Sequence, residues 1–139
     1  MSAIVISGDT SGTVTLQAPT IAGGTTITLP NTSSSMGFLN IPAVGSKTTS
    51  YTLTTMDVGK YVEVGTSGSI VIPTNTFTQG DAVTIYNNTT STIAITCSAP
   101  TTYISGINTV KTSMNLQSRG LVTLLFTSPT FCVASGAVA

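Results

Sequence analysis

Apolar and polar residues alternate along much of this chain, in short runs that end at Gly, Pro, Asn or Ser. In residues 12–19, Val14 and Leu16 occupy alternate positions, and Thr or Gln fills the positions between them. Residues 24–30 repeat this arrangement. Alternation of this period predicts β-strands with one buried face. Each run ends in a proline, which cannot donate to a strand ladder and therefore ends the strand.

The segment 31–47 opens with small polar residues, and Gly37, Pro42 and Gly45 interrupt its remaining part. We therefore interpret it as a connector. The first 47 residues hold too few large apolar side chains for a core of their own. We expect residues 1–47 to form an extended N-terminal arm that pairs with the rest of its chain or exchanges strands with neighbouring copies.

Residues 48–139 have the strand and turn spacing of one compact all-β domain. Nine segments fit the strand pattern, namely 51–54, 60–64, 69–73, 82–87, 92–97, 102–104, 114–116, 121–126 and 131–134. One helical turn is expected at 56–58, capped by Thr55. We predict an all-β fold, with an antiparallel β-sandwich or jelly-roll-like domain at 48–139 that the arm precedes.

The composition shows that the chain has very few charged residues. Only 4 Lys+Arg and 4 Asp+Glu occur among 139 residues, for a net charge of zero, and 6% of the residues are charged. Scattered basic residues leave no electrostatic footprint, so we expect no nucleic-acid partner. A surface of hydroxyls and apolar groups tends to associate, which predicts a component of an assembly. The alternative is a secreted or halotolerant domain kept in solution by its Ser and Thr hydroxyls.

Membrane insertion is not expected either. The longest apolar stretch, residues 121–126, is interrupted by Thr123 and is far shorter than the ~20 residues that span a bilayer. The first six residues have no basic region before their apolar part, so no secretory signal is visible.

Side chains for catalysis or metal binding are scarce. The chain has no His, which excludes His-based triads and zinc sites. Glu63 and Asp81 lie on or beside neighbouring predicted strands, but a solvent-facing or strand-end position explains them better than a hydrolytic carboxylate pair. Cys97 and Cys132 are interpreted as core thiols, with a disulfide between two sheets as the alternative. We expect no enzymatic activity, cofactor or metal.

Three stretches carry a resemblance to known proteins. GDTSGTVTLQAPTIAGGTTITLPNTSS, residues 8–34, resembles segments found repeatedly in structural proteins of tailed bacteriophages. SYTLTTMDVGKYVEV, residues 50–64, and SIVIPTNTFTQGDAVTIYNNTTSTIAIT, residues 69–96, resemble a β module of phage tail fibres and capsid surface proteins. The frame of that likeness comprises Leu53, Thr54, Asp57, Gly59, Lys60, Pro73, Phe77, Gly80, Asp81 and Asn87.

The resemblance implies a non-enzymatic virion component, usually a homotrimer, that contacts the major capsid protein or another virion protein. Because the sequence runs from Met1 to Ala139 without a shaft-forming repeat, we expect a capsid decoration (cement) protein on the capsid surface. The alternative is a tail fibre or receptor-binding module. That role predicts a host-glycan site formed by an exposed cluster that would include Tyr86, Asn87, Asn88 and Tyr103.

The arm's alternating apolar residues are the expected contacts with other subunits or with the shell, and three residues after the polar connector form a second anchor. The two sets are Ile4, Ile6, Val14, Leu16, Ile27 and Leu29, followed by Phe38, Leu39 and Ile41. The alternative is that these side chains fold back on their own domain.

Overall fold

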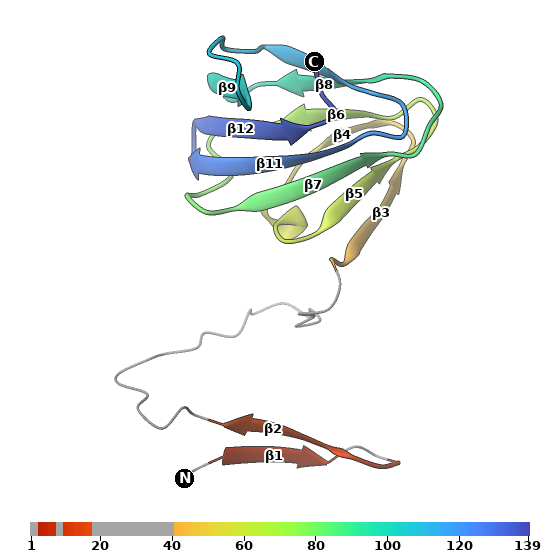
Figure 1. The fold of residues 1–139 in the computed structure, drawn as a ribbon, viewed down its shortest axis with the longest axis vertical. Coiled ribbons are helices and arrows are strands. Elements are labelled where there is room, and N and C mark those ends of the chain that lie inside the picture. The colour runs from red at the N-terminus through yellow and green to blue at the C-terminus, as the bar shows by residue number, and fades with distance from the viewer. Residues whose placement is uncertain (1–2, 8–9, 18–40) are drawn as a thin grey trace. The chain divides into compact units, whose positions relative to one another are not determined.

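The computed structural model describes residues 3–7, 10–17 and 41–139, and the chain divides into two units between Ser34 and Ser35. In the first unit, β1 (Ala3–Ser7) and β2 (Thr13–Gln17) pair as an antiparallel hairpin (Figure 1). The strand predicted within 12–19 is confirmed by β2, whereas the one predicted at 24–30 lies outside the described residues.

Two sheets make up the second unit (Figure 1). The six-stranded sheet has the order β3 (Ala43–Lys47), β5 (Tyr61–Val64), β7 (Ala82–Asn87), β11 (Leu121–Ser128), β12 (Phe131–Gly136) and β9 (Thr101–Ile104). The four-stranded sheet has the order β10 (Ser113–Leu116), β8 (Ile93–Cys97), β6 (Ser69–Ile72) and β4 (Ser50–Thr52). All nine strands predicted after residue 48 are present. The all-β prediction is therefore confirmed for the part of the chain that the structure describes.

From β3 to β11 the chain passes back and forth between the two sheets, one strand at a time. Each of the pairs β3–β4, β5–β6 and β7–β8 makes one coil, by which we mean a strand of the six-stranded sheet followed by a strand of the four-stranded sheet. Equivalent strands of neighbouring coils lie side by side and pair in parallel, as in β3–β5–β7 and β4–β6–β8. The C-terminal hairpin β11–β12 then joins the six-stranded sheet through the antiparallel pairing of β11 with β7.

The sheets are mixed, so the prediction of an antiparallel sandwich is wrong in this respect. Antiparallel pairing was expected because short strands separated by turn residues are typical of hairpins. Here several of those turns carry the chain into the opposite sheet. When the chain comes back to the first sheet, its next strand there runs in the same direction as the previous one, so the two strands pair in parallel. The strand order does not confirm the jelly-roll-like alternative.

A second correction concerns residues 31–47, which we interpreted as a connector. Their last part forms β3, which pairs in parallel with β5. Val44 packs against the core. Gly45, interpreted as an interruption, has φ +98° and lies where the register shifts between Ala43 and Gly45, so this glycine allows a bulge within the strand.

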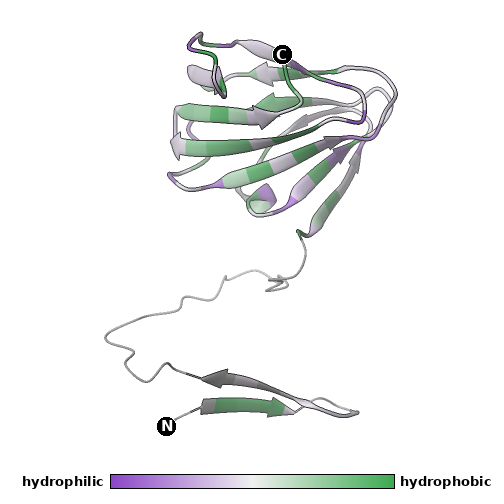
Figure 2. Ribbon diagram, in the orientation of Figure 1, coloured by the Kyte–Doolittle hydropathy of each residue, from purple (hydrophilic) through white to green (hydrophobic). Residues whose placement is uncertain are grey.

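One hydrophobic core joins the two sheets. Along β5, β6 and β7, buried residues alternate with half-buried ones, and Figure 2 shows the matching alternation of hydrophobic and polar positions. The largest fully buried side chains are those of Phe77, Phe126, Leu53, Ile70, Ile72, Ile85, Ile95, Met114, Leu116 and Leu124. The Phe77 and Phe126 rings stack with centroids 4.0 Å apart.

Two similar turns lead into β5 and β7. In the first, the backbone N–H of Thr54 donates to the Asp57 carboxylate at 2.7 Å. In the second, the N–H of Thr78 donates to Asp81 at 2.8 Å. The first turn contains the 3-10 helix η1 (Thr55–Asp57), so the helical turn begins one residue earlier than predicted and Thr54, not Thr55, precedes it.

Candidate interaction surface

The outward sides of the two sheets differ in chemistry. Side chains that alternate with the core residues point away from the core, because strand residues alternate between faces. On the four-stranded sheet these positions hold small and mostly polar residues, namely Ser50, Thr52, Ser69, Val71, Ala94, Thr96, Ser113 and Asn115. On the six-stranded sheet they include seven large apolar or aromatic residues, Tyr61, Tyr86, Tyr103, Leu121, Leu125, Phe131 and Val133, which we call the apolar face.

The middle of the apolar face is a ridge formed by two leucines of β11. Leu121 is 51% exposed and Leu125 is 46% exposed. Between them Thr123 faces Thr84 of β7, and their hydroxyl oxygens lie 3.1 Å apart in a hydrogen bond. Large apolar side chains that stay half exposed on a central strand are typical of a surface that another molecule covers.

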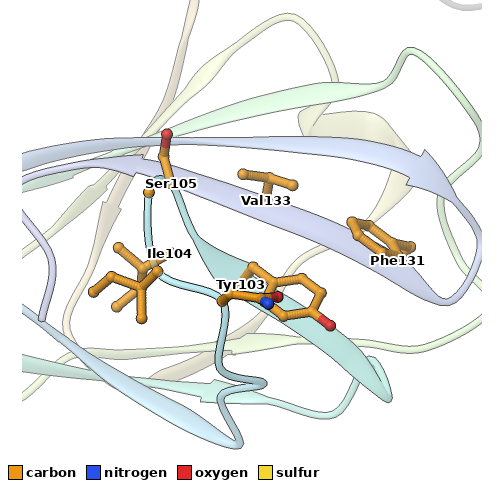
Figure 3. Close-up of a pocket in the computed structure, with 8 residues that line it drawn as sticks. Tyr103, Ile104, Ser105, Phe131 and Val133 are labelled. Atoms are coloured by element: carbon orange, nitrogen blue, oxygen red, sulfur yellow. The ribbon is translucent and has the colours of Figure 1, made fainter.

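A groove of about 500 Å³ lies beside this ridge, at the β9 edge of the same sheet (Figure 3). Tyr103 of β9 and Phe131 of β12 form part of its wall, with ring centroids 5.4 Å apart and an interplanar angle of 41°. Val133, Ile104 and the loop from Ser105 to Asn108 complete the lining. No Asp, Glu, Lys or Arg is among the residues that line the groove.

A polar cluster lies on β5, β7 and the turn before β11. The Asn88 amide donates to the Glu63 carboxylate at 3.0 Å. The Asn88 side-chain oxygen accepts from the Arg119 guanidinium and, at 3.5 Å, from the Tyr86 hydroxyl. One amide therefore connects an anionic and a cationic side chain, and the cluster as a whole is neutral.

The glycan site expected for the tail-fibre role is not assembled as predicted. Asn87 is fully buried, and its amide nitrogen donates to the carbonyls of Ser91 and Gln117 at 2.8 and 2.9 Å. It therefore holds the loop together and cannot face a ligand. Tyr86 lies on β7, and the sheet order places β11 and β12 between that strand and β9, which carries Tyr103. The four residues do not form one cluster.

The contacts predicted in the arm are only partly described. On β1, Ile4 is 65% exposed and Ile6 is 56% exposed. Their register partners on β2 are Leu16 and Val14. The remaining predicted contact within the described residues is Ile41, which is exposed. Ile27, Leu29, Phe38 and Leu39 lie outside the described residues.

The two cysteines are free thiols in the core, one on each sheet, so the disulfide alternative is not observed. Burial raises the pKa of Cys97 to about 11. Burial also raises the pKa of Cys132, to about 12, and the neighbouring Cys97 thiol adds to this shift. Protonated, buried thiols are poor nucleophiles and poor metal ligands.

Carboxylates are engaged in local hydrogen bonds. The fully buried Asp57 accepts from Tyr51 and Thr54, and Asp81 accepts from Thr78. Glu63 belongs to the polar cluster, while Asp9 lies outside the described residues. In the described part of the chain, no three His, Cys, Asp or Glu side chains gather as a possible metal site.

A scan against models of known protein families and a search of curated proteins found no match to this chain. Among residues 3–7, 10–17 and 41–139, the structure has no helix of the length and hydrophobicity needed to cross a bilayer.

Proposed function

We propose that this protein is a non-enzymatic structural subunit of a tailed-bacteriophage virion and works as a homo-oligomer, with a trimer as the expected form. The observation that carries the proposal is the apolar face, which leaves seven large side chains on one sheet of a chain with only 6% charged residues. Covering that face with other subunits removes apolar surface from water. The resemblance of residues 50–64 and 69–96 to phage β modules supplies the virion context.

Within the virion, we propose that the protein decorates the capsid as a cement protein. Packaged nucleic acid pushes the shell outward, and a subunit bound across neighbouring shell proteins would oppose their separation. A standard interface buries ~1,600 Å² in total. Several symmetric attachments strengthen one another through avidity, so each contact can be weak and uncharged. The N-terminal hairpin, with exposed Ile4 and Ile6, is the proposed attachment to a neighbouring subunit or to the shell.

The proposed contacts predict how particles lose the protein. Uncharged contacts are insensitive to ionic screening, whereas urea weakens apolar association. Virions washed in concentrated sodium chloride should keep the protein, and virions treated with urea or heat should release it before the shell breaks. Electron cryomicroscopy of the particles should place the protein on the capsid. Release in moderate salt alone would contradict this mechanism.

A tail-fibre or receptor-binding module is the second candidate, and the groove between Tyr103 and Phe131 favours it. Aromatic rings beside neutral polar groups can bind a sugar, because the C–H bonds of the sugar pack against the negative face of the aromatic ring. This role predicts that the purified protein adsorbs to host cells and that a soluble host glycan competes with adsorption. The cement role predicts binding to undecorated capsids instead.

A further inference from the structure

We propose that Leu121 of one copy inserts into the groove of a second copy of this chain. The inference rests on the proposed homo-oligomer and names the contact that builds it. Leu121 and the groove are separate features of one apolar face. The groove is lined by apolar and aromatic side chains and by three small residues of the loop, namely Tyr103, Ile104, Ile107, Phe131 and Val133 with Ser105, Gly106 and Asn108.

Register decides which leucine is the inserted side chain. Leu125 is the direct partner of Val133 across the β11–β12 ladder, so it lies beside a residue that lines the groove of its own chain. Leu125 therefore extends the rim of its own groove. Leu121 is four residues before Leu125 on the same strand, or roughly 14 Å away. It is the more exposed of the two and is free to enter a groove on another molecule.

Charge favours a second copy as the occupant. Two identical molecules present identical charges, so a face with an excess of one sign repels its own copies. Neither Leu121 nor any residue of the groove carries a formal charge near neutral pH. The polar cluster balances Glu63 against Arg119 through Asn88. Lys111 lies next to β9, where its backbone N–H donates to the Thr102 carbonyl. Leu121 and the groove themselves can therefore meet without charge repulsion.

Leu121, the knob of the contact, and the groove are separate, so the contact can be built in two ways. Two copies that exchange their knobs form a two-fold dimer, whereas copies that each offer Leu121 to one neighbour and the groove to another make a head-to-tail contact. Such contacts close into a ring when the rotation between copies permits it. A ring of three copies would use every knob and every groove once.

Two exposed positions test the contact without disturbing the core. Leu121→Asp places a carboxylate on the knob, and Ile107→Asp places one at the groove, where Ile107 is 43% exposed. Each variant of the full chain should lose the oligomer and sediment as a 14.1 kDa monomer. Mixing them should restore a two-chain species, because the groove of Leu121→Asp is intact and so is the knob of Ile107→Asp.

Thr96→Asp is the matched control, since it adds the same charge to the outward side of the four-stranded sheet. It should leave the oligomer intact. Far-UV circular dichroism checks that all three variants keep the fold. Oligomers that persist in both single variants, or a mixture that stays monomeric, would overturn the knob-and-groove contact while leaving the proposed oligomer standing. A monomeric wild-type chain would overturn the oligomer itself. If Ile107→Asp stays oligomeric and loses binding to host glycans, the groove holds a sugar instead.

Discussion

Single buried polar side chains hold the loops of this domain in place. The Asn87 amide nitrogen lies within hydrogen-bonding distance of three carbonyls, those of Ser91, Leu116 and Gln117. Its side-chain oxygen accepts from the backbone N–H and the hydroxyl of Thr89. All of the polar atoms of the Asn87 side chain are therefore satisfied, which is why this residue can be buried.

Asn87→Asp should destabilise the protein strongly. The substitution replaces a donor that faces carbonyls with a carboxylate that repels them, in a site without exposure to water. We expect a loss of about 3–5 kcal/mol in the free energy of unfolding at pH 7, measured by urea denaturation. Asn115→Asp, on the exposed side of β10, is the control and should cost less than about 0.5 kcal/mol. Equal losses would contradict the role given to Asn87.

The buried thiols predict a dependence of stability on alkaline pH. The pKa values of Cys97 and Cys132 rise from an ordinary value of 9.0 to about 11 and about 12 in the folded protein. The unfolded chain therefore releases these protons first as the pH rises above 9, and unfolding becomes easier. Between pH 9 and pH 11, the wild type should lose about 1 kcal/mol per thiol for each pH unit.

Cys97→Ala/Cys132→Ala is the control for this titration. The double variant is less stable at pH 7 because it leaves a cavity, but its free energy of unfolding should fall less steeply above pH 9. Tyr51, whose pKa burial also raises, is present in both proteins. Identical slopes in wild type and variant would show that the thiols do not contribute.

At the scale of strands and turns, two turns of the same construction explain why a short pattern recurs in the sequence. Leu53-Thr54 and Phe77-Thr78 each place a buried side chain before a threonine, and Asp57 and Asp81 then close the turn. All of these residues except Thr78 belong to the set on which the proposed resemblance to phage β modules rests. Their recurrence agrees with the parallel pairing of β5 with β7, because equivalent turns must enter adjacent strands at the same level.

Strand positions in this fold were predictable, and strand pairing was not. The alternation in residues 82–87 identifies a strand with one buried side, which the structure confirms as β7. A turn such as 65–68 has the same composition whether the chain folds back in one sheet or crosses to the other. The choice depends on the packing of β5 and β6 into the shared core, and a local pattern does not contain that information.

Close approach of neighbouring coils predicts an asymmetry between two glycines of that turn. A Cβ on Gly68 would clash with the Lys47 carbonyl oxygen and lie 2.6 Å from a methyl group of Val64. A Cβ on Gly65 would meet first the Ser46 hydroxyl at 2.9 Å, which can rotate away. Gly68→Ala should therefore cost about 1–3 kcal/mol in urea denaturation, and Gly65→Ala clearly less. The reverse order would contradict the packing of this turn against β3.

At the scale of the whole molecule, the distribution of apolar side chains matters more than their number. The expectation of an assembly component came from low charge, which indicates association without saying where it occurs. The apolar face was missed because residues 121–126 were interpreted only as a strand. The signal was present in Leu121 and Leu125, since large apolar residues at both the inward and the outward positions of a strand indicate two covered sides. That signal becomes specific only when the sheet order places β11 centrally.

The proposed attachment through the N-terminal hairpin leads to the final prediction. In β1, Ile4 and Ile6 share one side and Val5 lies on the other, 58% exposed. Ile4→Thr/Ile6→Thr keeps residues that favour strands and removes the two exposed isoleucines of β1. This double variant should retain its circular dichroism spectrum and lose binding to undecorated capsids in a pelleting assay, because the apolar attachment is gone. Val5→Thr should bind as the wild type does. Equal binding by all three proteins would show that this side of the hairpin makes no attachment, and equal loss in Val5→Thr would show that both sides of the hairpin are covered in the virion.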